Sequence, residues 1–233
     1  MSVRQVLGVW GLGVLVVGVA TFSVRAEGPS PDASLARLKS GNARITHMAV
    51  KSGTEAPMPR AAQPVAAVLS CAESLMPSEE VFGAAPGELF VVRSLGHVVD
   101  HATLASVEYA VERLHVPLVV VLGHEMCGAL RAASDTLPGQ SSGPHYDFLI
   151  KALKPAVSRA SGMPESQRMR TAVLENVEES INTLLQDSAI IRHLAQEHRI
   201  RLVGAFHESS SGRVFFSELV DVPHLESAVA ERH

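Results

Sequence analysis

Short runs of apolar residues alternate with longer amphipathic segments along most of this chain. The apolar runs are short enough to be buried strands and lie at 65–70, 89–93 and 118–122. Helical periodicity is found at 102–114, from 127 onward for a short stretch, and at 146–158, 165–185 and 188–198. This alternation is typical of βαβ units, so it predicts one α/β domain built on a parallel sheet.

The end of the patterned region predicts a β-hairpin. Apolar runs at 200–206 and 214–217 are separated by Ser209-Ser210-Ser211-Gly212, which has the composition of a loose turn. The hairpin would place one further strand beside the strand that begins at 200.

Residues 1–26 have the features of a Sec-type signal peptide. Arg4 precedes an apolar run, and Val24-Arg25-Ala26 places small residues three and one before a cleavage point. We therefore expect a signal peptide at 1–26 and a mature domain at 27–233, in the periplasm or secreted. The alternative is an uncleaved N-terminal membrane anchor, because the apolar run is just long enough to span a bilayer.

The charge of the mature chain argues against nucleic acid as a partner. Removal of Arg4 and Arg25 with the signal would change the formal net charge from −4 to −6. The remaining basic residues form no long run, so the basic surface that nucleic acid requires is not indicated.

Both cysteines of the chain and one histidine lie just beyond the ends of predicted strands. Cys71 follows the run at 65–70, and His124 follows the run at 118–122, three positions before Cys127. The carboxyl ends of adjacent parallel strands meet in one crevice, so these side chains are expected to converge. Two thiolates and one imidazole are three ligands of a tetrahedral zinc site, and a catalytic zinc keeps its fourth position for water or substrate.

A disulfide is the alternative role for the two cysteines. An exported protein meets an oxidising compartment, where Cys71 and Cys127 could simply form a bridge. A structural bridge has no need of His124 at this spacing, nor of two strand ends. Spacing alone therefore favours zinc and leaves the disulfide open.

The cysteines and His124 belong to a series of ordered motifs. These are Cys-Ala-Glu-Ser-Leu-Met-Pro at 71–77, Pro-Gly-Glu-Leu-Phe-Val-Val-Arg at 86–93, Gly96-His97, Ala-Ser-Val-Glu-Tyr-Ala-Val at 105–111 and Gly-His-Glu-Met-Cys-Gly-Ala at 123–129. In this order and spacing, the chain resembles the β-class carbonic anhydrase family. The segments at 38–42, 203–205 and 211–212 extend the resemblance over essentially the whole mature chain.

The resemblance implies a fold, a cofactor and a reaction. The fold would be a parallel β-sheet with an antiparallel edge strand, flanked by helices, and the protein would assemble as a homodimer or homotetramer. Cys71, His124 and Cys127 fall on the family's three zinc ligands. Such zinc lyases (carbonate dehydratases) interconvert carbon dioxide and bicarbonate by generating hydroxide on the metal.

Two positions depart from the family's pattern. The family has Cys-x-Asp-Ser-Arg, in which the arginine holds the aspartate away from zinc, whereas this chain has Glu73 and Leu75. Leu75 cannot hold a carboxylate, so Glu73 is expected to have lost its tether. Glu73 could therefore perform part of the catalytic role of the family's aspartate, or bind zinc as a fourth ligand and close the site. Its charge would also raise the pKa of a coordinated water and weaken hydration.

Three further residues are expected near the site from the resemblance. Gln63 resembles a substrate-binding glutamine of the family, shifted by one position. Ser74 matches the family and would lie near the substrate or stabilise a turn. His97 is expected to pack or to lie at the surface rather than to bind metal.

The sequence thus supports two functions of different classes. One is an exported zinc-dependent carbonic anhydrase, with activity weakened by the altered Asp-Arg pair. The other is a catalytically silent zinc-binding protein on the same fold, with Glu73 as the fourth ligand. A hydrolase acting on an analogue such as carbonyl sulfide is a third reading, because fold alone does not fix the reaction.

Overall fold

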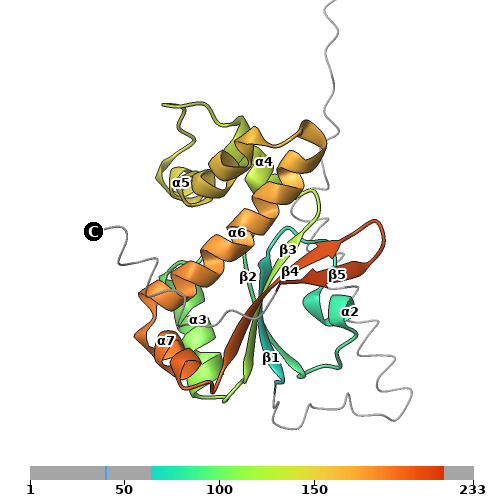
Figure 1. Ribbon diagram of the computed structural model, residues 1–233, viewed down its shortest axis with the longest axis vertical. Helices are drawn as coiled ribbons and strands as arrows, with labels where there is room; N and C mark the ends of the chain where they lie inside the picture. Colours follow the sequence, from blue (N-terminus) through green and yellow to red (C-terminus); the bar gives the residue numbers. More distant parts are fainter. Residues whose placement is uncertain (1–39, 41–63, 218–233) are drawn as a thin grey trace, which may run out of the picture. The chain divides into compact units, whose positions relative to one another are not determined.

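The structure is a computed structural model that describes Ser40 and residues 64–217 (Figure 1). The signal peptide predicted at 1–26 and the predicted substrate-binding residue Gln63 lie outside these described residues. Within the described ranges, no helix is both long and apolar enough to cross a bilayer.

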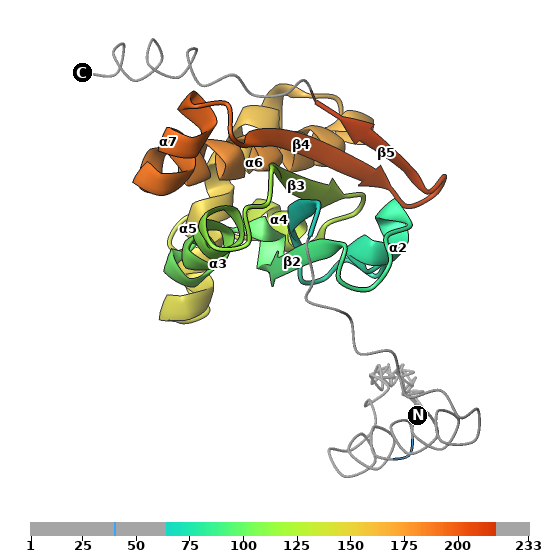
Figure 2. The same ribbon diagram turned by 90° about the horizontal axis from the view of Figure 1, so that it is seen from below.

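The described domain is built on one five-stranded sheet. The strand order is β2-β1-β3-β4-β5. The strands comprise β1 (Ala66–Cys71), β2 (Leu89–Ser94), β3 (Leu118–His124), β4 (Arg201–Glu208) and β5 (Arg213–Phe216). The first four in spatial order are parallel, and β5 runs antiparallel to β4 at the edge (Figure 2). The predicted α/β fold with an antiparallel edge strand is confirmed.

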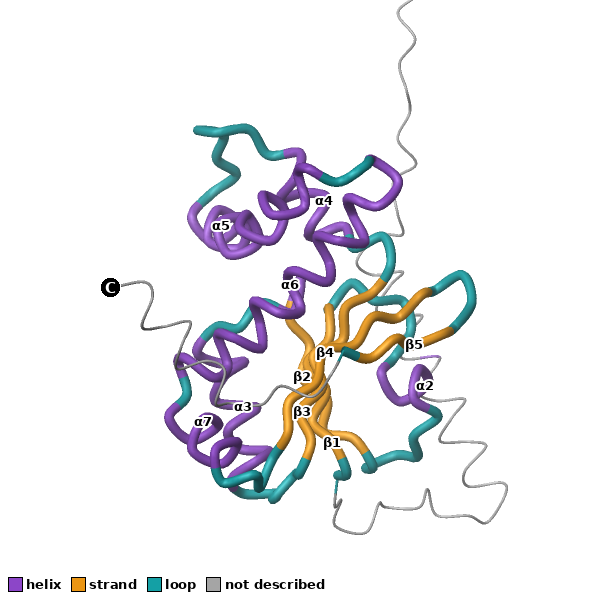
Figure 3. Tube along the Cα trace, in the orientation of Figure 1, coloured by secondary structure: helices purple, strands orange, loops and turns teal. Residues whose placement is uncertain are grey.

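Helices cover both faces of the sheet and the end where β1 and β3 finish. On one face lie α3 (His101–Glu112), α6 (Glu165–Asp187) and α7 (Ala189–Gln196), whereas α2 (Ser78–Phe82) lies on the other (Figure 3). Beyond the strand ends lie α4 (Gly128–Asp135) and α5 (Pro144–Arg159). Two 3₁₀ turns complete the described elements, η1 (Leu95–His97) and η2 (Ala160–Gly162). The sequence did not predict α2, because five residues are too short to show helical periodicity.

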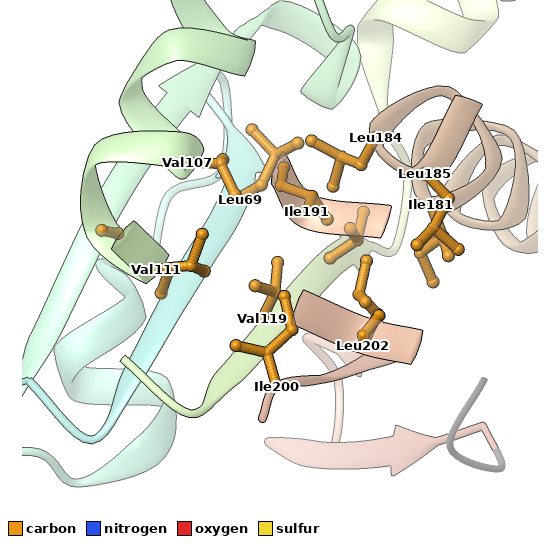
Figure 4. Packing of buried hydrophobic residues seen from close by; sticks show 14 of the residues in the cluster. Leu69, Val107, Val111, Val119, Ile181, Leu184, Leu185, Ile191, Ile200 and Leu202 are labelled. Carbon is orange, nitrogen blue, oxygen red and sulfur yellow. The ribbon is translucent and has the colours of Figure 1, made fainter. Parts of the chain in front are cut away.

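Alternate residues of the strands fill two separate parts of the core. Leu69, Val119 and Leu202 face α3, α6 and α7 (Figure 4). Their neighbours Val68 and Val120 point to the opposite face, toward the side chains of α2. Both faces of the central strands are therefore buried, and each large aliphatic side chain contributes about 1.5–3 kcal/mol to folding.

Two glycines allow α6 to lie directly against the sheet. A Cβ atom added to Gly123 of β3 would lie 2.5 Å from Cγ1 of Val173, and one added to Gly204 of β4 would lie 2.7 Å from Cγ1 of Val177. Atoms cannot approach so closely, so no residue larger than glycine fits at either position without moving the helix. The position of α6 relative to β3 and β4 is fixed by this contact.

We expect Gly123→Ala to lower the free energy of unfolding by about 1–3 kcal/mol, because the added methyl group overpacks against a stiff valine. Urea denaturation measures this loss. Gly162→Ala is the matched control, since a Cβ atom there meets no atom within 4 Å. Equal stability of Gly123→Ala and Gly162→Ala would contradict the close contact of α6 with the sheet.

Candidate metal centre

Four side chains from two separate segments of the chain, 71–73 and 124–127, meet at the carboxyl end of the sheet. Cys71 is the last residue of β1, His124 is the last residue of β3, and Cys127 precedes the first residue of α4. Their ligand atoms and a carboxylate oxygen of Glu73 all lie within 4.8 Å of one another. The convergence predicted from the strand ends is confirmed. Both cysteines are free thiols in this structure, which does not support the disulfide alternative.

The imidazole of His124 is arranged as a metal ligand. Its Nδ1 lies 3.0 Å from the carbonyl oxygen of Glu125, which accepts a hydrogen bond when Nδ1 carries the proton. Its Nε2 is buried and has no hydrogen-bond partner among the described residues. A buried polar atom without a partner is costly, and a metal bound at Nε2 would satisfy it. The donor set of two sulfurs and one nitrogen fits zinc.

The two thiols are strongly coupled. A hydrogen bond from Cys127 outweighs burial and lowers the pKa of Cys71 well below its usual range. The same interaction raises the pKa of Cys127, whose ionisation would place two negative charges side by side. Burial alone would lower the pKa of His124, but the neighbouring Cys71 thiolate outweighs it and raises this pKa. The two thiols thus share one proton, which a divalent metal ion bound between them would displace.

The carboxylate of Glu73 is bound to the N-terminus of α4. Oε1 accepts a hydrogen bond from the Gly128 N–H at 3.0 Å, and Oε2 accepts one from the Ala129 N–H at 3.2 Å. A Cβ atom at Gly128 would lie 2.5 Å from Oε1, so only glycine permits this approach. The expectation that Glu73 has lost its tether is therefore wrong. Backbone N–H groups at the positive end of a helix hold it instead of an arginine.

Leu75 lies away from this arrangement, as its side chain is 97% exposed. An arginine does hold the loop, but it comes from β2. Arg93 donates hydrogen bonds to the carbonyl oxygens of Cys71 at 3.1 Å, Ala72 at 3.2 Å and Ser74 at 2.6 Å. Arg93 thus fixes the backbone between Cys71 and Ser74, a role that its sequence position alone did not reveal.

The sequence from 66 to 214 matches the family model for carbonic anhydrase, and this range is well over half of the chain. The chain belongs to the β-class carbonic anhydrase family. Carbonic anhydrase 2 of Mycobacterium tuberculosis is 32% identical over 192 residues, which cover 79% of this chain and 91% of that protein. The carbonic anhydrase of Mycolicibacterium smegmatis is 34% identical over 194 residues, with 79% and 92% coverage.

Solved β-carbonic anhydrases have the same fold. A tetrameric β-carbonic anhydrase from Sordaria macrospora superimposes with a TM-score of 0.66 at 25% identity, covering 80% of this chain and 98% of that one. The fold described above therefore belongs to an established architecture.

The other residues predicted at the carbonic anhydrase site have different surroundings. Ser74 donates a hydrogen bond to the carbonyl oxygen of Met76 at 3.1 Å, which is the turn-stabilising role considered for it. His97 is buried, as expected for a packing residue. No contact described for Ser74 links it to a substrate position, so that role stays a prediction.

We expect Cys71→Ser to weaken zinc binding more than about 100-fold, because changes to groups behind a ligand already cost 10–100-fold. Competition with a chromogenic chelator measures the affinity, and thermal unfolding with and without chelator reports the accompanying loss of stability. Zinc binding equal to that of the unchanged protein would refute the assignment of Cys71 as a ligand.

Proposed function

We propose that this protein is a zinc-dependent carbonic anhydrase that interconverts carbon dioxide and bicarbonate. The observation that carries the proposal is the buried cluster of Cys71, His124 and Cys127, in which the His124 Nε2 has no protein partner within the described residues. Zinc bound there would supply a Lewis acid and lower the pKa of a coordinated water toward neutrality. The relatives named as carbonic anhydrases support this reaction.

The residues around the cluster hold its ligands in place. The Gly96 N–H donates a hydrogen bond to Cys71 Sγ at 3.2 Å. The carbonyl of Glu125 contacts the Nδ1 of His124, which leaves the buried Nε2 as the ring nitrogen available to a metal. Burial of the ligands among apolar side chains of α4 and α5 excludes competing water from the sulfur atoms.

We infer that Glu73 accepts a hydrogen bond from the attacking water rather than binding zinc. Each of its oxygens is engaged by one N–H of α4, which leaves lone pairs directed elsewhere. The helix N-terminus also offsets part of the carboxylate's charge. The remaining charge disfavours ionisation of a coordinated water, so we propose that hydration at neutral pH is slower than at a site whose carboxylate pairs with an arginine.

The effect of Glu73→Ala on hydration has opposite signs for the two roles of Glu73. If Glu73 accepts the water's proton, kcat/KM should fall by about tenfold or more, because a positioned acceptor contributes at least this much. If Glu73 closes the site as a fourth ligand, its removal should raise kcat/KM. Stopped-flow hydration of carbon dioxide, with zinc content measured on the same samples, distinguishes these outcomes.

Glu88→Ala is the matched control for this experiment. Glu88 also accepts a hydrogen bond from a backbone N–H, that of Ala85 at 2.8 Å, but it precedes β2 at the opposite end of the sheet. The proposal would be contradicted if the zinc-loaded protein did not hydrate carbon dioxide and Glu73→Ala raised kcat/KM. The protein would then be the catalytically silent zinc-binding protein.

We also propose that the protein is a homodimer or homotetramer. Three large apolar side chains are exposed: Leu75 at 97% and Met126 at 66%, each within two residues of a residue of the metal centre, and Leu95 at 38%, which precedes the Gly96 that contacts Cys71. Exposed apolar side chains grouped beside a site favour contact with another protein surface. The tetrameric relative from Sordaria macrospora supports a second copy of this chain as that surface.

Export through a Sec-type signal is proposed from the sequence of residues 1–26. Cleavage after Ala26 would release residues 27–233 into the periplasm or the medium. Retention of the apolar run would instead leave the protein attached to the membrane.

One preparation tests both proposals. The full chain of 233 residues is expressed in a bacterial host and recovered from the periplasmic fraction. Intact-mass measurement should give a chain that begins at Glu27, and light scattering should give at least twice the mass of that chain. Recovery only from the membrane fraction would indicate the anchor, and the mass of a single chain would contradict assembly.

A further inference from the structure

The buried face of α6 includes two polar residues that are not needed for packing. Val173, Val177 and Ile181 form its apolar stripe, and Asn176 and Ser180 lie beside them with only 3% and 4% of their surface exposed. Polar side chains are buried at a cost unless hydrogen bonds compensate it. Their hydrogen bonds lead toward the metal centre.

Asn176 contacts a residue that in turn contacts a metal ligand. Its Nδ2 donates a hydrogen bond to the Gly96 carbonyl oxygen at 2.7 Å. The N–H of Gly96 donates to Cys71 Sγ at 3.2 Å. The carbonyl group of Gly96 is therefore held by α6, and its N–H group binds the thiolate of Cys71.

The backbone at Gly96 and His97 needs this support. Gly96 has φ +66° and His97 has φ +44°, in the left-handed region that side chains other than glycine rarely adopt. A Cβ atom at Gly96 would lie 2.9 Å from Cδ2 of Leu153, so a larger residue there would have to displace the Leu153 side chain. The direction of the Gly96 N–H thus depends on the contacts that hold this turn.

His97 and Ser180 complete those contacts. Ser180 Oγ donates a hydrogen bond to the carbonyl oxygen of His97 at 3.0 Å, and the His97 Nδ1 lies 3.1 Å from both Ser180 Oγ and Asn176 Nδ2. Burial lowers the pKa of His97 to about 4, so the ring is neutral near pH 7 and can accept a hydrogen bond. The Asn176 amide is thereby oriented by a packed ring as well as by the carbonyl of Gly96.

We propose that Asn176 is a positioning residue for the metal ligand Cys71, acting through the N–H of Gly96. A hydrogen bond to a thiolate withdraws charge from sulfur, so its geometry sets how strongly Cys71 donates to the metal. The inference rests on the zinc centre proposed above, but it does not depend on which reaction that centre performs. A residue that only packed the core would leave the electronic state of the thiolate unchanged.

The test uses the full-length protein loaded with Co²⁺, whose thiolate-to-cobalt charge-transfer absorption reports on sulfur. Asn176→Leu keeps the approximate shape of the side chain and removes the donor. We expect its absorption band to move to longer wavelength, because a sulfur with a weaker hydrogen bond gives up charge more easily. We also expect zinc affinity to fall by about 10–100-fold, as for other groups that orient metal ligands.

Asn182→Leu is the matched control, because Asn182 lies on the same helix and is only partly buried. It should leave both the band and the zinc affinity unchanged. Ser180→Ala is the second variant, and it should move the band in the same direction by a smaller amount. It keeps the test decisive if Asn176→Leu does not fold.

An unmoved band and unchanged zinc affinity in a folded Asn176→Leu protein would overturn the inference. If only Ser180→Ala folds, an unmoved band and unchanged zinc affinity in that variant would also overturn the inference. If the protein without any substitution binds neither cobalt nor zinc, the proposed function is wrong. The unsubstituted protein could also bind zinc without hydrating carbon dioxide. If the absorption band still moves in Asn176→Leu, that result would support the inference and contradict only the proposed reaction.

Discussion

The arrangement of this molecule depends on the direct contact between α6 and the backbone of β3 and β4. Gly123 and Gly204 leave no side chain between helix and sheet, so Val173 and Val177 touch the strands themselves. A helix of 23 residues is roughly 35 Å long and extends from the apolar core to the metal centre. Because Asn176 lies on the same face as Val173, the packing that fixes the helix also fixes the amide that holds Gly96.

The metal centre combines charges that come from the backbone as much as from side chains. The carboxylate of Glu73 is paired with two N–H groups of α4, and the thiolate of Cys71 accepts an N–H from Gly96. Only a change to proline removes a backbone donor, but the close approach of the carboxylate to these donors depends on Gly128. The electrostatic balance of the site therefore depends on the path of the backbone.

The sequence predicts the parts of this structure that follow from local pattern and general topology. Cys71 and His124 could be placed together because both end apolar runs, and parallel strands bring their ends into one crevice. The partner of Glu73 could not be predicted, because it is a backbone group 55 positions away at Gly128 and carries no side-chain signature. The role of Asn176 could not be predicted for a similar reason, because its partner is the backbone carbonyl of Gly96, 80 positions away.

The hydrogen bonds from Arg93 to the loop after Cys71 act on the backbone of that loop rather than on the side chains beside the metal ligands. Arg93 binds only carbonyl oxygens there, so its contacts with the loop do not depend on which side chains stand at 73 and 75. Substitutions at those two positions can alter the chemistry beside the metal while the ligand Cys71 keeps its place. In this chain, different residues therefore set the path of the loop and the chemistry beside the metal ligands.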